Sequence, residues 1–194
     1  MTVKQQFFKT VYPLYVRLSK FSEHKSKVLR HHAVQPPLSF YSLQAVTGNK
    51  EPFNLANLAG RKVLLVNTAS GCGFTQQFDQ LQQLYKRYQQ SLVVLAFPTT
   101  DFDRDDNNDA QIALFCKEQF RVSFPIMQKT VVKSGRSQNA VYRWLTDPRQ
   151  NGWNLQAPTW NFCKYLLNEE GKLLAYFGTA IEPLGKEIIT AIEA

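Results

Sequence analysis

From Ser39 onward, short apolar runs alternate with longer segments in which apolar residues recur at helical spacing. Residues 62–67 (KVLLVN) and 92–97 (LVVLAF) are apolar runs with the length of buried strands. Helical spacing characterises three further segments: 76–88, 109–120 and 139–145. Because strands that alternate with helices usually pair in parallel, this part of the chain predicts two βα units.

The C-terminal part predicts a different arrangement. Two apolar runs, 162–167 and 173–177, flank the turn-forming residues 168–172 (NEEGK), a pattern typical of a β-hairpin. A last helix is expected after Pro183. Two βα units followed by a hairpin and a closing helix predict an α/β protein with a thioredoxin-like fold, in which helices flank a central mixed β-sheet.

Composition and charge narrow the class of protein. The 194 residues are 44% hydrophobic, which suits one domain with a single core, and no apolar run is long enough to span a membrane. The formal net charge of +8 is uneven, since residues 1–34 carry a net +6 and the remainder only +2. A nearly neutral body has no strong electrostatic reason to bind nucleic acid, so neither a nucleic-acid partner nor stable membrane insertion is expected.

The basic N-terminal segment is set apart by the linker Gln35-Pro36-Pro37. Residues 1–38 are therefore expected to form an N-terminal extension and residues 39–194 a folded domain. The extension is basic, amphipathic and poor in acids, which is typical of a mitochondrial targeting segment. A disordered tail on a cytoplasmic protein is the alternative. All three histidines lie in this extension without the spacing of metal ligands, so no metal site is expected.

Cys72 is the residue whose surroundings indicate chemistry. It lies in residues 67–75 (NTASGCGFT), between a predicted strand and a predicted helix. The start of a helix favours the thiolate, which is the nucleophilic form of cysteine. A packing role is the alternative, although the flanking glycines leave the sulfur approachable. Three cysteines without a CxxC pair are too few to predict a disulfide scaffold.

Four blocks resemble the signature blocks of glutathione peroxidases, in the same order and spacing: 67–75, Phe97–Pro98, Ser123–Pro125 and Trp160–Phe162. The resemblance extends over residues 39–194. It implies a thiol peroxidase that works without a cofactor. In such an enzyme Cys72 attacks a peroxide oxygen and becomes a sulfenic acid, while water or an alcohol leaves.

The resemblance also implies which residues surround the sulfur. Trp160 and Asn161 match a Trp and an Asn whose neutral N–H groups stabilise the thiolate or the leaving oxyanion. Asp101 stands where the family has Gln. Because an ionised carboxylate cannot donate a hydrogen bond and repels a thiolate, we expect lower activity, or a changed pH optimum, relative to an Asp101→Gln variant.

The other two cysteines have different expected roles. Cys116 takes the place of the resolving cysteine of fungal and bacterial two-cysteine members, so the resemblance implies a disulfide with Cys72 once its helix has unwound. Burial as a packing residue is the alternative for Cys116. Packing is the expected role of Cys163, although alternation along a strand would place it on the same face as Asn161.

The short connection 145–159 resembles that of members without a long loop over the active site. It implies a monomer or weak dimer whose open site admits hydrogen peroxide and organic or lipid hydroperoxides. It also implies thioredoxin rather than glutathione as the reductant. The alternative function is a peroxide sensor, or redox relay, that passes oxidation from Cys72 to a partner protein.

Overall fold

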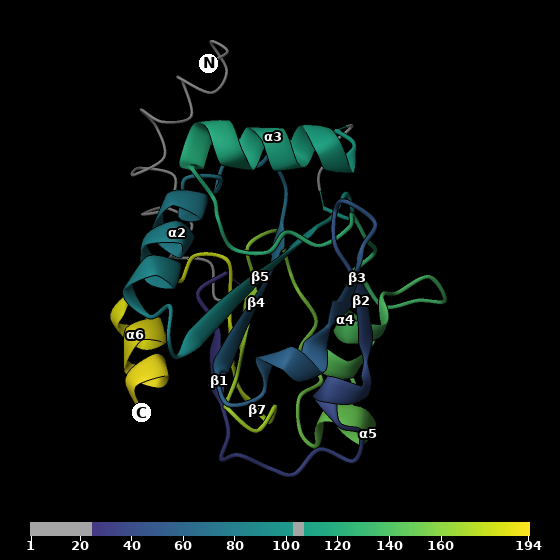
Figure 1. Ribbon diagram of the computed structural model, residues 1–194. Coiled ribbons are helices and arrows are strands. Elements are labelled where there is room, and N and C mark those ends of the chain that lie inside the picture. The colour runs from purple at the N-terminus through teal and green to yellow at the C-terminus, as the bar shows by residue number, and fades with distance from the viewer. Residues whose placement is uncertain (1–24, 103–106) are drawn as a thin grey trace.

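The structure of the protein, a computed structural model, describes residues 25–102 and 107–194. Within these residues a five-stranded sheet lies at the centre, with its strands in the order β1-β7-β6-β4-β5 (Figure 1). β4 and β5 are parallel, and the other neighbours are antiparallel. The strands are β1 (Val28–Arg30), β4 (Lys62–Thr68), β5 (Leu92–Pro98), β6 (Lys164–Leu167) and β7 (Leu173–Phe177). The mixed sheet expected from the sequence is confirmed.

Helices and a small hairpin surround this sheet (Figure 1). The helices are α2 (Gln77–Arg87), α3 (Asp109–Phe120), α4 (Ala140–Leu145), α5 (Pro148–Asn151) and α6 (Lys186–Glu193), with 3₁₀ helices η1 (Phe40–Ser42) and η2 (Leu55–Leu58). A small hairpin is formed by β2 (Gln44–Val46) and β3 (Pro52–Asn54). The sheet has α2 and α6 on one side and α4, α5 and this hairpin on the other. α3 crosses the end of the sheet at which β4 and β5 finish. No helix in the described part is long and apolar enough to cross a membrane.

The side chains of β4 divide the interior into two apolar clusters, one on each face of the sheet. Leu64 and Val66 belong to the first cluster, with residues of α2, α3 and α6. Val63 and Leu65 belong to the second, with residues of α4. This division follows from the strand geometry, because successive side chains of a strand point to opposite faces of the sheet.

β1 extends the sheet into the segment that was assigned from the sequence to the N-terminal extension. The N–H groups of Gly178 and Ala180 donate to the carbonyls of Lys27 and Lys25, each at 2.8 Å. The folded part therefore begins before the expected boundary at residue 39. A strand of three residues is too short to show periodicity, and it forms because β7 offers an open edge. Residues 1–24, with most of the expected targeting segment, lie outside the described residues.

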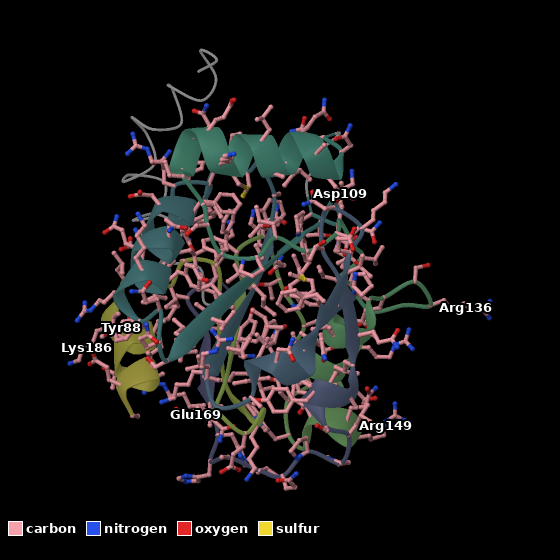
Figure 2. The ribbon with its side chains drawn as sticks, in the orientation of Figure 1. Tyr88, Asp109, Arg136, Arg149, Glu169 and Lys186 are labelled. Carbon is pink, nitrogen blue, oxygen red and sulfur yellow. The ribbon has the colours of Figure 1, made fainter. Side chains whose placement is uncertain are left out.

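α3 contributes few fully buried side chains to the core. Of its twelve residues, only Ile112 and Cys116 are buried, and Leu114 is 54% exposed. Its first residue, Asp109, labelled in Figure 2, accepts a hydrogen bond from the Lys129 N–H at 2.6 Å. The helix is therefore tied down near its start, and further along it packs on α2 through Phe115 and Phe120, whose ring centroids lie 6.4 and 5.5 Å from that of Phe78.

Candidate active site

Cys72 lies in the turn that joins β4 to α2. Its side chain is 3% exposed, and its Sγ accepts a hydrogen bond from the Phe74 N–H at 3.5 Å. The expected position directly at the start of a helix is wrong, because α2 begins only at Gln77. The residues between form turns, in which the Thr75 N–H donates to the Cys72 carbonyl at 3.3 Å. A backbone N–H of this turn, rather than the first turn of α2, is therefore directed at the sulfur.

Trp160 and Asn161 lie in a turn just before β6. Asn67, near the end of β4, holds this turn through both ends of its amide: Nδ2 donates to the Trp160 carbonyl at 2.9 Å, and Oδ1 accepts from the Cys163 N–H at 3.1 Å. Phe162 has φ 65°, in the left-handed region, so the chain reverses here and β6 starts at Lys164 rather than at residue 162. The predicted Trp160 and Asn161 are thereby placed beside the strand that leads to Cys72.

Asn67 is a site residue that sequence reasoning missed. Its side chain is fully buried in a strand that is otherwise mostly apolar. A buried amide needs hydrogen-bond partners, so an Asn at the end of an apolar run, directly before the Cys72 turn, was the available signal.

Several polar atoms around this turn are buried and have no hydrogen-bond partner within the described residues. They are the Trp160 Nε1, the Asn161 Nδ2 and Oδ1, the Thr68 Oγ1 and the Gln77 Oε1. A buried polar group without a partner costs about 1–3 kcal/mol, so proteins rarely keep one without a function. The two N–H groups of Trp160 and Asn161 are the neutral donors that an anionic sulfur or a peroxide oxygen requires.

Asp101 anchors a loop. Its Oδ2 accepts hydrogen bonds from the N–H groups of Val132 and Lys133, at 2.6 and 2.7 Å. The next residue, Phe102, packs on Trp160 with 5.9 Å between ring centroids. Asp101 therefore affects the site through Phe102 rather than by direct contact. The family pattern has Gln at this position, and a carboxylate oxygen that accepts two hydrogen bonds cannot replace the N–H donor of that Gln.

The three cysteines are not joined by disulfides, and the sheet separates Cys163 from the other two. Cys72 and Cys116 belong to the first apolar cluster, and Cys116 is fully buried on α3. Cys163 belongs to the second cluster, where its Sγ accepts a hydrogen bond from the Tyr176 hydroxyl at 3.2 Å. The prediction that Cys163 shares a strand face with Asn161 is wrong, because the reversal at Phe162 precedes β6.

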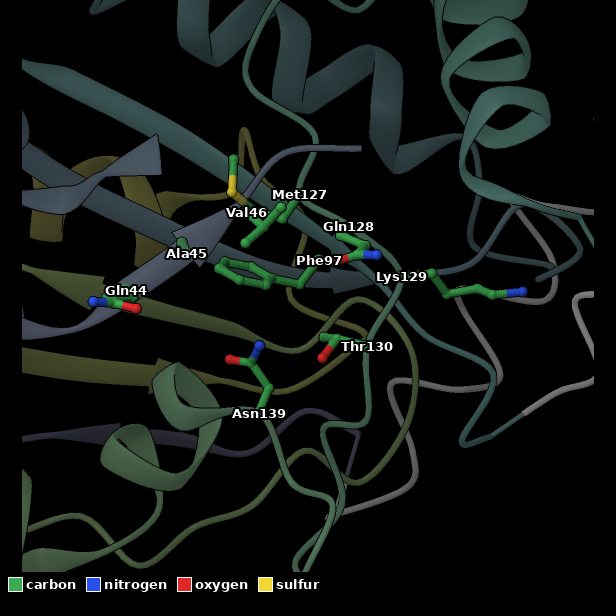
Figure 3. Close-up of a pocket in the computed structure, with 9 residues that line it drawn as sticks. All are labelled: Gln44, Ala45, Val46, Phe97, Met127, Gln128, Lys129, Thr130 and Asn139. Atoms are coloured by element: carbon green, nitrogen blue, oxygen red, sulfur yellow. The ribbon is translucent and has the colours of Figure 1, made fainter. Parts of the chain in front are cut away.

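A separate pocket opens on the side of the second cluster (Figure 3). It has a volume of about 90 Å³ and lies between β2, the end of β5 and the start of α4. Its lining consists of Gln44, Ala45, Val46, Phe97, Met127, Gln128, Lys129, Thr130 and Asn139. None of the predicted site residues is among them.

Comparisons with known proteins agree with this arrangement. The sequence matches the glutathione peroxidase family model over residues 40–146. It is 37% identical to glutathione peroxidase-like peroxiredoxin 2 of Saccharomyces cerevisiae, over 75% of this chain and 90% of that protein. It is 34% identical to a glutathione peroxidase of Lactococcus lactis, over 75% and 93% of the two chains. A crystal structure described as Trgpx in apo form is 31% identical, with a TM-score of 0.62 over 80% of this chain and 96% of that one. This chain therefore belongs to the glutathione peroxidase family.

Proposed function

We propose that the protein is a thiol peroxidase that reduces hydroperoxides at Cys72 and uses Cys116 as its resolving cysteine. The observation that carries the proposal is that Cys72 and Cys116 share one apolar cluster, whereas Cys163 lies in the cluster on the other face of the sheet. The relatives named glutathione peroxidase and glutathione peroxidase-like peroxiredoxin support the same reaction.

In the first step the Cys72 thiolate attacks one oxygen of the hydroperoxide. An S–O bond forms as the O–O bond breaks, so the sulfur loses two electrons to the peroxide and becomes a sulfenic acid. The leaving oxygen takes up a proton and departs as water or an alcohol. We infer that the Trp160 Nε1–H and the Asn161 amide donate to the charge that develops, and the absence of a hydrogen-bond partner for either within the described residues supports this role.

In the second step the Cys116 thiolate attacks the sulfenic sulfur. A disulfide forms and hydroxide leaves, which takes up a proton to become water. Such a bond requires Cα atoms about 4.4–6.8 Å apart, and we infer that part of α3 unwinds and moves toward the Cys72 turn to reach this distance. This movement releases Ile112 and Cys116, the buried residues of α3, and the contacts of Phe115 and Phe120 with Phe78, so we expect disulfide formation to require local unfolding of the helix.

The disulfide is then returned to two thiols by a dithiol protein of the thioredoxin type, through a mixed disulfide. A relay that hands the oxidation to another protein would stop after one equivalent of peroxide unless that partner is present. Steady-state turnover with thioredoxin therefore separates the enzyme from the relay.

A coupled peroxidase assay with thioredoxin and, separately, with glutathione tests the proposal. Cys72→Ser is expected to abolish turnover, and Cys116→Ser to abolish turnover with thioredoxin while one equivalent of peroxide still oxidises Cys72. Cys163→Ser is the matched control and should retain turnover, because Cys163 is a buried thiol on the opposite face. Activity in Cys72→Ser, or a disulfide mapped between Cys72 and Cys163, would overturn the proposal.

A monomer or weak dimer with an open site is part of the same proposal. Residues 145–159 hold α5 and a tight loop, in which the Asn151 Nδ2 donates to the carbonyls of Trp144 and Asn154, each at 2.8 Å. The Asn154 Nδ2 donates to the Leu145 carbonyl at 2.7 Å. A connection folded back on itself in this way supports an uncovered site. Sedimentation velocity that revealed a stable tetramer would contradict it.

A further inference from the structure

A lysine of the N-terminal segment lies against the proposed catalytic indole. The Lys25 Nζ is 5.7 Å from the centroid of the Trp160 ring. The backbone of Lys25 is fixed at the same time, because its carbonyl accepts the Ala180 N–H at 2.8 Å. A cation within about 6 Å of the face of a Trp ring is attracted by the ring's electrons.

Lys25 lies in a segment of the chain that precedes the family match. The match begins at residue 40, whereas Lys25 precedes β1 (Val28–Arg30), which adds an edge strand to β7. The hydrogen bonds from Gly178 and Ala180 to the Lys27 and Lys25 carbonyls continue the pairing beyond β1 toward Trp160. The addition of β1 is therefore what carries a positive charge to the site.

The indole that receives this charge has an unused donor. The Trp160 Nε1–H is buried without a hydrogen-bond partner among the described residues. The Trp160 ring also contacts Phe102, whose side chain offers it no hydrogen-bond acceptor. A cation on the ring face draws electron density from the indole, which strengthens its N–H as a donor to an anion.

We propose that Lys25 is a positioning residue for peroxide reduction: its ammonium fixes the Trp160 ring and polarises the N–H bond that Trp160 offers to the Cys72 sulfur. The inference rests on the proposed function, in which Trp160 donates to the reacting sulfur. Lys25 itself touches neither the sulfur nor the peroxide in this account.

Lys27 provides a matched control. It lies two residues further along the same segment, and its backbone pairs with the same loop after β7. Its Nζ, however, donates to the Gln156 Oε1 at 2.7 Å. Replacing Lys27 removes the same amount of charge from the same segment without removing the contact with Trp160.

The test compares Lys25→Met, Lys25→Arg and Lys27→Met in the full-length protein, each with Trp160 intact and with Trp160→Phe. Phe keeps an aromatic ring for the ammonium but has no N–H. Stopped-flow measurements of Cys72 oxidation by hydrogen peroxide give the second-order rate constant, and the pH profile of alkylation by iodoacetamide reports thiolate formation.

Lys25→Met is expected to slow oxidation about threefold, the factor of an ordinary cation–π contact, and to shift the alkylation profile upward by about half a pH unit. Lys25→Arg, which keeps a cation at this position, should leave the rate constant and the alkylation profile close to those of the unmodified protein. Lys27→Met should also leave both quantities unchanged. In Trp160→Phe, which should itself be slow, Lys25→Met should have no further effect. Equal slowing by Lys25→Met and Lys27→Met, or slowing by Lys25→Met that persists in Trp160→Phe, would overturn the role of Lys25. If Trp160→Phe reacts as fast as the unmodified protein, the proposed role of Trp160 fails, and that of Lys25 with it.

Discussion

Lys164 is a fully buried lysine, and its titration should be visible in the stability of the protein. Its Nζ donates to the carbonyls of Thr179, at 3.3 Å, and Ile181. Burial removes water from the ammonium and lowers the pKa of Lys164 from 10.5 to about 7, against the opposing influence of Cys163 and Glu182. The sequence offered no reason to expect a neutral lysine in the sheet.

Proton binding decides whether stability rises or falls with pH. The pKa of Lys164 is about 7 in the folded protein and 10.5 in the unfolded chain. At pH values between these two, the unfolded chain holds a proton on Lys164 that the folded protein lacks. The free energy of unfolding therefore rises with pH in this window, by at most about 1.4 kcal/mol per pH unit for one proton. From pH 7.5 to 9.5 the contribution of Lys164 amounts to about 2.5 kcal/mol of added stability.

Urea unfolding of the reduced protein and of Lys164→Met, at pH 7.5, 8.5 and 9.5, measures this contribution. Subtracting the variant from the unmodified protein cancels the groups that both contain. The free energy of unfolding of the unmodified protein, minus that of Lys164→Met, should increase by about 2.5 kcal/mol from pH 7.5 to pH 9.5. Lys186→Met, an exposed lysine of α6 that points away from the body in Figure 2, controls for the loss of one positive charge. A difference that stays constant with pH for Lys164→Met would refute the reasoning.

Three further predictions concern single residues that hold turns and loops in place. Asn67→Ala should destabilise the protein by about 2–4 kcal/mol in urea unfolding, because it leaves two buried backbone groups unpaired, and should also slow Cys72 oxidation in stopped flow; normal kinetics would show that the Trp160 turn does not depend on Asn67. Asp101→Ala should cost about 1.5–3 kcal/mol by losing two hydrogen bonds to a carboxylate, whereas Asp101→Asn, which keeps an acceptor oxygen, should cost less; equal losses would argue against the loop anchor. Gly171→Ala should cost about 1–3 kcal/mol, since φ is +76° and the added Cβ would lie 2.9 Å from Tyr41, and an unchanged melting temperature would contradict this.

The structure changes the expectation attached to Asp101. From the sequence, an acid in the place of Gln predicted repulsion of the thiolate and a gain of activity in Asp101→Gln. With its Oδ2 bound by the backbone of Val132 and Lys133, the carboxylate has a structural task that a longer Gln side chain would disturb. The comparison of the two forms from pH 6 to 8 remains the test, and loss of stability in Asp101→Gln must be measured alongside the rate.

Local patterns were enough to predict most of the fold. The runs 62–67 and 92–97 became β4 and β5, the helix expected over 109–120 is α3, and the hairpin of β6 and β7 followed from two apolar runs around a turn. Burial of a strand or helix leaves a periodic record in the residues of that segment itself. The sequence also predicts Cys72, Trp160 and Asn161 as site residues, because they lie in short motifs that resemble one family.

Contacts between distant segments were decided only by the tertiary structure. The left-handed turn at Phe162 places Cys163 in the cluster opposite Cys72, which alternation along a continuous strand cannot predict. β1 pairs with β7, and Lys25 reaches Trp160, across more than a hundred residues of chain. No periodicity within either segment encodes such a partner, because each contact exists only once the sheet has formed and its edge strand is in place. The sequence alone therefore determined the elements and the reactive motif, and the tertiary structure determined which side chains meet around it.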